Sequence, residues 1–374
     1  MGRHRSGPEL IHFTRAAIAR PVVDYFDRLG SRTAPYLEKF HLSPDLFDDP
    51  DALVPLRPFH EFAYSLGRAE GIDHLGLRIA RSVSLAGLGA VGERLLRARN
   101  VFRYFDFGCR IAPAITTNQR FWLEFDGPRA RFCHAEADNA RPTDMYLFVL
   151  DVTIATLRAA VGGRWVPSEV TLPSAPAPGL AAISEAFTNV RADPGRPYAS
   201  FTFPRRFLTR PMQPPGTVDT ARRPLGFAPP PPRDFGESAQ RLAESLVIDG
   251  FADLPTAAEA SGLTRRTFQR RLAECGADFS HLVRDARISL SEQWLRETDR
   301  PITDIAHRLG YADSANFTRA FRQVNGLSPS AYRVGLLAER DPTVPASLGS
   351  RDDLSGRPFV SSNRVGRGSR PGVD

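Results

Sequence analysis

The chain has 374 residues, of which 42% are hydrophobic and 10% aromatic, so it can form two folded domains and is not intrinsically disordered. Its formal net charge of +7 at pH 7 suits a polyanionic partner. Three widely spaced cysteines argue against a disulfide-stabilised secreted scaffold, and the lack of a long apolar run argues against a membrane span, so we expect a cytoplasmic protein.

The N-terminal part of the chain combines helical and strand patterns. The first dozen residues, 1–12, are expected to be loose. Apolar residues recur at helical spacing over 16–29, 32–40, 57–69, 89–100 and 143–161. Strand patterns occupy 118–124, 131–135, 169–172 and 201–204, and the first two flank the turn signal Asp126-Gly127. We therefore predict an α+β domain over 13–212 that contains a β-hairpin.

Residues that could carry catalysis or bind a metal do not converge in this domain. Cys133 and His134 are the best candidates, but neighbouring strand residues point to opposite faces and cannot easily share a ligand. The acidic run at 48–51 suits a cation, although such runs are more often solvated loops before a helix. Residues 87–92 have the glycine spacing of a dinucleotide site without a preceding strand, which favours a helix entry. We predict no enzyme, no metal and no cofactor.

An aromatic-rich set in the same domain admits two interpretations. It could line an apolar pocket for a small ligand, but aromatic residues at such spacing more often belong to a core. The set comprises Phe102, Tyr104, Phe105, Phe107, Phe121 and Trp122. The sequence does not single out ligand-binding residues.

Two shifts in composition mark the limits of the folded regions. Residues 213–233 include seven prolines and few large apolar side chains, which predicts a semi-extended linker. Residues 341–374 are rich in Gly, Ser, Pro and Arg, which predicts a disordered tail with weak attraction to phosphate. A second folded domain is therefore expected over 234–340.

This second domain contains one helical unit twice, with the copies about 48 residues apart. Each copy has a small residue that allows close helix packing, and a glycine four residues later that suits a turn with positive φ. A second helix follows, with a hydroxyl residue to cap its start and two buried apolar positions. These positions are Ala258, Gly262, Thr264, Phe268 and Leu272 in the first copy and Ala306, Gly310, Ser314, Phe317 and Phe321 in the second. The spacing predicts an all-α domain with two helix-turn-helix units.

The exposed face of each second helix, called here the recognition helix, carries side chains suited to DNA. Arginine can pair with both acceptors of guanine, and glutamine can pair similarly with adenine. Because 234–340 holds 14 Arg against 15 Asp and Glu, DNA affinity must come from local placement rather than from bulk charge. The residues expected to contact DNA are Arg265, Arg266, Gln269, Arg270, Asn316, Thr318, Arg319 and Arg322.

The segment between the copies predicts a rigid spacer. Residues 279–298 contain neither Gly nor Pro and would form a helix of about 20 residues, roughly 30 Å long. Successive major-groove faces of B-DNA are about 34 Å apart. One chain could therefore contact a bipartite site.

The second copy also carries a family signature. Its residues are Ile305-Ala306, Leu309-Gly310-Tyr311, Asp313-Ser314, Phe317-Thr318-Arg319-Ala320-Phe321, Gly326 and Ser328-Pro329-Ser330-Ala331-Tyr332-Arg333. They resemble the signature of AraC/XylS-type transcription regulators, and the first domain more loosely resembles the arabinose-binding-type sensor domain of one branch of that family. The first copy departs from the pattern, because Ser261 stands where the second has Leu309, so its scaffold helix is expected to pack less well.

This resemblance implies a sequence-specific transcription regulator, expected as an activator, whose sensor domain responds to a small-molecule effector. The implied partners are promoter DNA, the effector, RNA polymerase and a second copy of the chain in a homodimer. The alternative is a metabolite-binding or catalytic N-terminal module in which DNA binding is incidental. The sequence leaves open the effector, the operator, and the choice between activation and repression.

Overall fold

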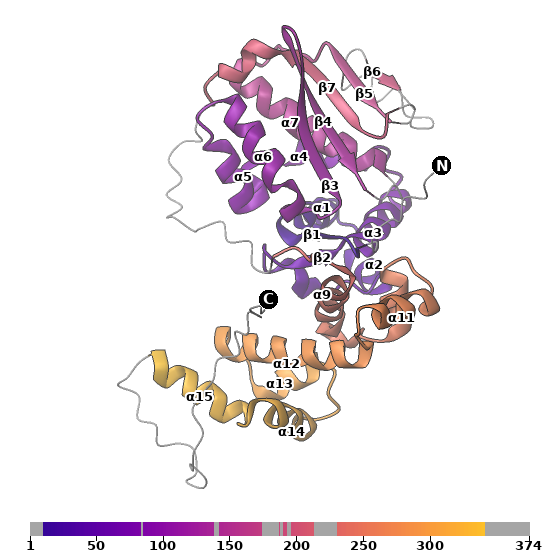
Figure 1. Ribbon diagram of the computed structural model, residues 1–374, viewed down its shortest axis with the longest axis vertical. Helices are drawn as coiled ribbons and strands as arrows, with labels where there is room; N and C mark the ends of the chain where they lie inside the picture. Colours follow the sequence, from indigo (N-terminus) through magenta and orange to yellow (C-terminus); the bar gives the residue numbers. More distant parts are fainter. Residues whose placement is uncertain are drawn as a thin grey trace, which may run out of the picture.

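The computed structural model describes residues 10–83, 85–137, 142–173, 187, 190–192, 196–212 and 230–340. Figure 1 shows an upper region of helices around a sheet and a lower, all-helical region that begins with α9 (Phe235–Val247). The predicted fold class, an α+β domain followed by an all-α domain, is confirmed. The predicted linker, as far as residue 229, and the predicted tail at 341–374 lie outside the described residues.

The described part of the N-terminal region contains the five predicted helices and two further helices, over 75–82 and 101–115, that the sequence did not predict. They are α1 (Ala16–Arg28), α2 (Thr33–Lys39), α3 (Leu56–Ala69), α4 (Leu75–Ser82), α5 (Gly89–Leu96), α6 (Val101–Ile115) and α7 (Pro142–Val161), with 3-10 turns η1 (Pro44–Phe47), η2 (Leu85–Leu88) and η3 (Arg205–Thr209). The prediction of one helix over 89–100 is wrong at its end. Asn100 instead caps α6, because its side-chain oxygen accepts a hydrogen bond from the Arg103 N–H at 2.9 Å.

The main sheet supports the core of this region. Five strands lie in the order β3 (Gln119–Asp126), β4 (Arg129–Glu136), β7 (Ala199–Pro204), β5 (Glu169–Leu172) and β6 (Val190–Ala192). β3 and β4 form the predicted hairpin, in which Asp126 pairs with Arg129 and Gly127 has φ +51°. Only the β5–β6 pair is parallel among the described strands. α7 contributes Tyr146, Leu150 and Ile154, all fully buried, to the core beside the sheet.

Most of the aromatic set belongs to this core. Tyr104 and Phe105 are buried, and the Phe105 ring stacks on Phe203 with 5.4 Å between centroids. Phe107 and Phe121 pack against the same cluster, half-buried. For these four residues the structure favours the core interpretation, because they all pack in one hydrophobic cluster.

A two-stranded sheet, β1 (Phe13–Arg15) with β2 (Leu53–Pro55), joins the beginning of the chain to α3. The expectation that 1–12 is loose is wrong for the last of these residues, since Ile11 is 4% exposed and its N–H donates to Ser238 Oγ on α9 at 3.2 Å. Ile11 packs with the core of the C-terminal region, and this burial offsets the entropy lost on ordering. Residues 1–9 lie outside the described part of the chain.

The C-terminal region is built around one long helix. After α9 come α10 (Leu254–Ala260), α11 (Arg265–Glu274), α12 (Phe279–Glu297), α13 (Ile302–Arg308), α14 (Ser314–Asn325) and α15 (Pro329–Arg340). α12, with 19 residues, is the predicted spacer helix. Phe268 of α11 and Phe317 and Phe321 of α14 are fully buried in one hydrophobic cluster, so the two repeated units share a core.

Candidate nucleic-acid interface

The repeated segments form two helix-turn-helix units, α10–α11 and α13–α14. Gly262 and Gly310 occupy the turns with φ of +71° and +72°, a conformation that strains any residue with a β-carbon. α11 buries Phe268 and Leu272. The predicted turn and packing positions are therefore confirmed in both copies.

The caps of the two recognition helices differ from each other. Thr264 caps α11 as predicted, since its hydroxyl accepts a hydrogen bond from the Thr267 N–H at 3.2 Å. The predicted cap Ser314 is wrong, because Ser314 is the first helical residue of α14. Asp313 is the cap, and its Oδ1 accepts from the Asn316 N–H at 2.6 Å. A carboxylate also suits the positive end of the helix dipole.

The first scaffold helix lacks one core contact that the second has. Leu309 is fully buried, whereas Ser261 is half-buried and its hydroxyl donates to the Ala258 carbonyl of its own helix at 2.8 Å. Ala257 and Ala258 still bury α10 against its neighbours. The first unit therefore packs with small side chains where the second uses a leucine.

All four candidate residues of α11 are exposed: Arg265, Arg266, Gln269 and Arg270. Arg270 is engaged in this state, because its Nη1 lies 2.5 Å from Glu274 Oε1, one helical turn on. The sequence prediction did not include Glu274, although the i, i+4 spacing of Arg and Glu was the signal that could have identified it. A carboxylate therefore competes with any base or phosphate for Arg270.

On α14, two of the four candidates are hydrogen-bonded to each other. Arg319 and Arg322 are exposed, and Asn316 and Thr318 are half-buried. The Asn316 oxygen accepts from Arg319 Nη2 at 2.5 Å, while its Nδ2 donates to Asp313 Oδ2 at 3.0 Å. The Thr318 hydroxyl donates to the Ser314 carbonyl at 2.8 Å within the helix. Asp313 thus orients Asn316 and Arg319, a role the sequence prediction missed.

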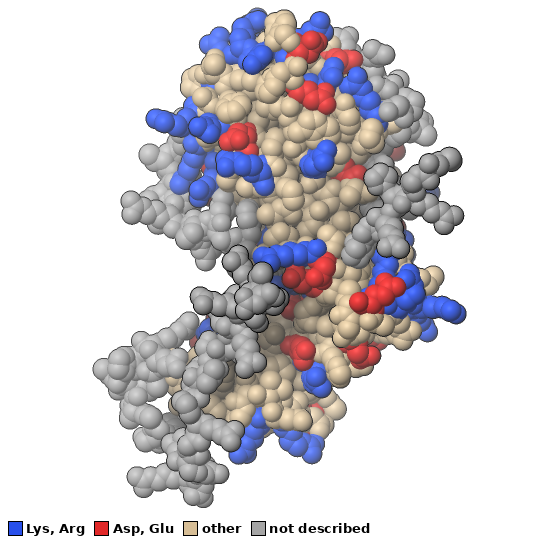
Figure 2. All heavy atoms as spheres, viewed as in Figure 1, with Lys and Arg blue, Asp and Glu red and all other residues tan. Residues whose placement is uncertain are grey.

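The surface charge of the C-terminal region agrees with local rather than bulk attraction to DNA. Figure 2 shows basic side chains over α11 and at the lower end of the molecule, with acidic side chains interspersed. Residues 234–340 contain 14 Arg and 15 Asp and Glu, so the net charge of this domain is close to zero. The exposed arginines of α11 and α14 are the basic groups that the two recognition helices present to solvent.

The last helix braces the second unit. The Ser328 hydroxyl accepts a hydrogen bond from the Ala331 N–H at 3.3 Å, which confirms the predicted cap of α15. The Tyr332 ring packs on Phe321 with 5.3 Å between centroids, also as predicted. Arg333 Nη2 donates to the Arg300 carbonyl at 2.7 Å and joins α15 to the start of α13.

The N-terminal region contacts both helix-turn-helix units. Asp45 of η1 forms ion pairs with Arg300, at 3.7 Å between Oδ2 and Nη1, and with Arg308 of α13. Arg57 of α3 lies over the turn of the first unit, where a β-carbon on Gly262 would come within 2.8 Å of Nη1. These contacts hold the scaffold parts of both units and leave the candidate side chains of α11 exposed.

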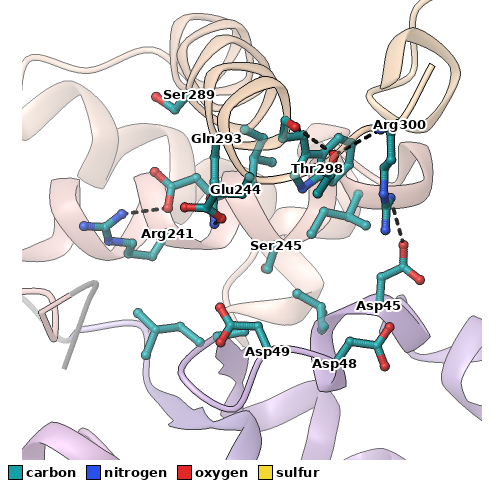
Figure 3. Close-up of a pocket in the computed structure, with 17 residues that line it drawn as sticks. Asp45, Asp48, Asp49, Arg241, Glu244, Ser245, Ser289, Gln293, Thr298 and Arg300 are labelled. Atoms are coloured by element: carbon teal, nitrogen blue, oxygen red, sulfur yellow. Dashed lines mark hydrogen bonds and ion pairs between the residues drawn. The ribbon is translucent and has the colours of Figure 1, made fainter. Parts of the chain in front are cut away.

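A cavity of about 620 Å³ lies between the two regions beside the Asp45 ion pairs. In Figure 3, Asp45, Asp48 and Asp49 lie on the N-terminal side, opposite Arg241 and Glu244 of α9 and Arg300. Arg241 pairs with Glu244 at 2.8 Å, and the Thr298 hydroxyl accepts from the Arg300 N–H at 3.4 Å. The polar walls are therefore occupied by contacts within the C-terminal side and by the Asp45–Arg300 ion pair across the cavity.

The acidic run and the glycine-rich segment have structural roles. Asp48 and Asp49 are exposed, and Asp49 Oδ1 accepts from the Asp51 N–H at 3.0 Å in a loop that leads into β2. α5 begins at Gly89, which confirms the predicted helix entry. The described residues contain no group of three His, Cys, Asp or Glu placed to hold a metal ion.

Cys133 and His134 lie back to back on β4, as predicted. Burial raises the pKa of the Cys133 thiol, which lies near Glu124. Burial lowers the pKa of His134 to about 3, and its ring packs against Phe121 and Tyr146 at 4.8 and 4.9 Å. The two side chains therefore do not form a common site.

Known proteins match this chain in both regions. Residues 30–212 match the family described as the arabinose-binding domain of AraC transcription regulators, and residues 257–334 match a helix-turn-helix domain family. The ornithine utilization regulator of Pseudomonas aeruginosa is 25% identical over 326 residues, which cover 85% of this chain and 95% of that protein. The transcriptional regulator VirS of Mycobacterium tuberculosis is 25% identical over 345 residues, or 87% and 97% of the two chains.

A solved structure of the transcriptional regulator CdpR from Pseudomonas aeruginosa aligns with a TM-score of 0.38 and 17% identity, over 85% of this chain and 98% of that one. The family matches and the two named regulators favour a regulatory role for the repeated units over a catalytic N-terminal module. No helix in the described part of the chain is long and apolar enough to span a membrane.

Proposed function

This chain belongs to the AraC family of DNA-binding transcription regulators, and from that premise we propose that α11 and α14 contact adjacent major-groove faces of one operator. The observation that carries the proposal is that both recognition helices expose arginines while the 19-residue α12 and a shared core join them. A helix of that length spans about 28 Å, close to the roughly 34 Å of one DNA turn.

Each candidate side chain receives a role by its chemistry. Arg270 and Arg319, equivalent in the repeat, suit bidentate contacts to guanine, and Gln269 suits adenine. Arg265, Arg266 and Arg322 suit phosphates, which fix the position of the protein on the duplex. Asn316 and Thr318 lie beside Arg319, where they limit which base it can reach.

We also propose the remaining partners, which the family match supports in part. The α+β region over 13–212 senses a small effector and brings two copies of the chain together in a homodimer. Residues 234–340 bind promoter DNA in the cytoplasm, where RNA polymerase is the partner whose activity changes. The N-terminal region has no catalytic task in this proposal, since Cys133 and His134 do not form a common site.

The test uses DNA fragments selected by the purified full-length protein. Arg270→Ala and Arg319→Ala should each weaken binding to the selected fragment by about 10- to 100-fold, because one bidentate base contact is worth about 1–3 kcal/mol of discrimination. Arg284→Ala on α12 is the matched control, as it removes an exposed arginine outside the recognition helices. Affinity is measured by gel-shift titration at fixed salt.

Three results would contradict the proposal. The protein could select no fragment at low salt, the two recognition-helix variants could bind as tightly as the control, or all three could weaken specific and random DNA equally. Circular dichroism of each variant establishes that a loss of binding is not a loss of fold.

A further inference from the structure

A second cavity lies within the N-terminal region, walled by α1, α3, α4 and α7. Its volume is about 680 Å³, within the range of small-molecule sites. Most of its wall is apolar, with Ile18, Phe59, Ala63, Ile79 and Phe148 among the lining residues. The cavity is therefore suited to a molecule with a substantial apolar body.

Among the buried polar side-chain atoms of this wall, one lacks a partner in the described part of the chain. His60 Nε2 is buried without a hydrogen bond to any described residue. The Thr14 hydroxyl is already bonded to the Thr116 hydroxyl at 2.9 Å, and Asp144 Oδ1 accepts from the Gly76 N–H at 3.2 Å. A buried polar atom without a partner costs about 1–3 kcal/mol, so an occupant that bonds to His60 gains this energy on binding.

The electrostatics of the wall disfavour a charged occupant. Burial lowers the pKa of His60 to about 4 and raises the pKa of Asp144, so the interior opposes charge on both groups. Arg68 and Asp73, of opposite sign, are exposed at the edge of the cavity. A buried charge in the occupant would lose its hydration, and Arg68 and Asp73 lie in solvent, which screens any pairing with it.

We propose that this cavity is the effector site of the regulator, and that it takes an uncharged, largely apolar molecule whose single hydroxyl or carbonyl group hydrogen-bonds His60. The inference rests on the proposed function. A sugar such as arabinose fits the site poorly, because the apolar side chains that form most of the wall offer few partners for several buried hydroxyls.

The position of α3 explains how occupancy reaches the DNA-binding region. Helix α3 carries His60 and Ala63 in the cavity wall, and Arg57 near its first turn covers the Gly262 turn of the first helix-turn-helix. A shift of α3 on binding would therefore move the contact to α10 and α11. The first unit, which has the smaller packing residues, is the one that receives this shift.

The binding test titrates the full-length protein with Nile red, an uncharged apolar dye whose fluorescence rises in apolar surroundings. Wild type should bind it saturably, and Ala63→Trp should weaken binding at least tenfold, because the indole fills the cavity. Thr209→Trp, which adds the same ring at an exposed position of η3, is the matched control. Absence of saturable binding, or equal binding by Ala63→Trp, would overturn the inference.

The chemical class is tested by displacement of the dye with three molecules of one shape: 4-phenylbutanol, 4-phenylbutylamine and 4-phenylbutyrate. The alcohol should compete at least tenfold better than either charged molecule, and His60→Phe should remove most of that advantage. Better competition by the amine, the acid or arabinose would overturn the proposed class. Dye binding does not require DNA and operator binding does not require the dye, so this inference and the proposed function can fail separately.

Discussion

At the scale of single residues, the DNA-binding candidates are held by acidic neighbours. Glu274 pairs with Arg270 on α11, and Asp313 bonds to Asn316, which in turn bonds to Arg319 on α14. The two acids act differently. Glu274 forms an ion pair with the guanidinium of Arg270. Asp313 instead bonds to the Asn316 side chain, whose uncharged amide oxygen accepts a hydrogen bond from the guanidinium of Arg319. In the proposed complex, Arg270 exchanges a carboxylate for DNA, whereas Arg319 has no carboxylate to exchange.

Replacing Glu274→Gln should tighten DNA binding about threefold, because an exposed ion pair is worth about 0.2–1 kcal/mol and the variant also removes repulsion from phosphate. Gel-shift titrations at two salt concentrations check this, and the gain should shrink at the higher one. Glu292→Gln on α12 is the control, since it removes the same charge away from both recognition helices. A weaker complex with Glu274→Gln would show that the pair instead positions Arg270 for DNA.

His60 should make the stability of the protein depend on pH. The unfolded chain protonates this imidazole near pH 6.5, whereas the folded protein does so near pH 4. Between these values the unfolded state binds more protons, so the free energy of unfolding falls as the pH is lowered. The loss attributable to His60 should approach about 2–3 kcal/mol at pH 4 and be absent above pH 7.

Urea unfolding of wild type and His60→Phe between pH 4 and 8 measures this difference. As the pH falls, the free energy of unfolding should decrease more for wild type than for the variant, because the variant has no imidazole to protonate at this position. Parallel curves across the range would show that His60 titrates normally in the folded protein.

At the scale of elements, the helix-turn-helix unit depends on its turn glycine and on the cap that follows. Gly262 and Gly310 take positive φ, and Thr264 and Asp313 satisfy the first free N–H groups of α11 and α14. The caps differ in charge while the turns agree closely. The backbone conformation of the turn is therefore the same in both units, whereas the type of capping residue differs.

Gly310→Ala should destabilise the protein by about 1–2 kcal/mol, because its φ of +72° strains a residue with a β-carbon. The nearest atom to that carbon, Arg287 Nη2 at 3.2 Å, ends a flexible side chain and can move. Gly335→Ala in α15 is the control, since its β-carbon meets nothing within 4 Å and helix propensity favours alanine. Thermal unfolding of both variants measures the difference. Equal stability of Gly310→Ala and Gly335→Ala would contradict the expected backbone strain at position 310.

At the scale of the whole molecule, the sensor and DNA-binding regions share a continuous interface. Ile11, Phe13 and Leu53 from the first region pack in the hydrophobic core of the second. Asp45 adds an ion pair to Arg300, just before the second unit, and another to Arg308 within it. Both helix-turn-helix units are thus held from one side by the N-terminal region.

Asp45→Asn should loosen this interface without unfolding either region. We expect faster amide exchange in α13 and a stability loss of about 1 kcal/mol or less, as for partly exposed ion pairs. Asp48→Asn is the matched control, because Asp48 lines the same cavity but pairs with Arg20 of its own region at 3.8 Å. Unchanged exchange in α13 would show that the apolar contacts alone hold the interface.

Local signals predicted the repeated units well, for physical reasons visible in single residues. The positive φ of Gly262 and Gly310, the burial of Phe268 and Phe317, and the length of α12 each follow from short-range spacing. The errors also arose locally. Asp313 and Ser314 can both cap a helix, and the residue whose side chain reaches the free N–H is decided by where the turn ends.

The sequence by itself determined the two-domain order, the double helix-turn-helix and the exposed arginines, because helical periodicity and turn glycines act over a few residues. Only the tertiary structure decided which residues from distant segments contact one another. It placed Asp45 on Arg308, Arg57 over the Gly262 turn, and His60 in an apolar cavity. Such contacts depend on the packing of whole helices against one another, which no local pattern encodes.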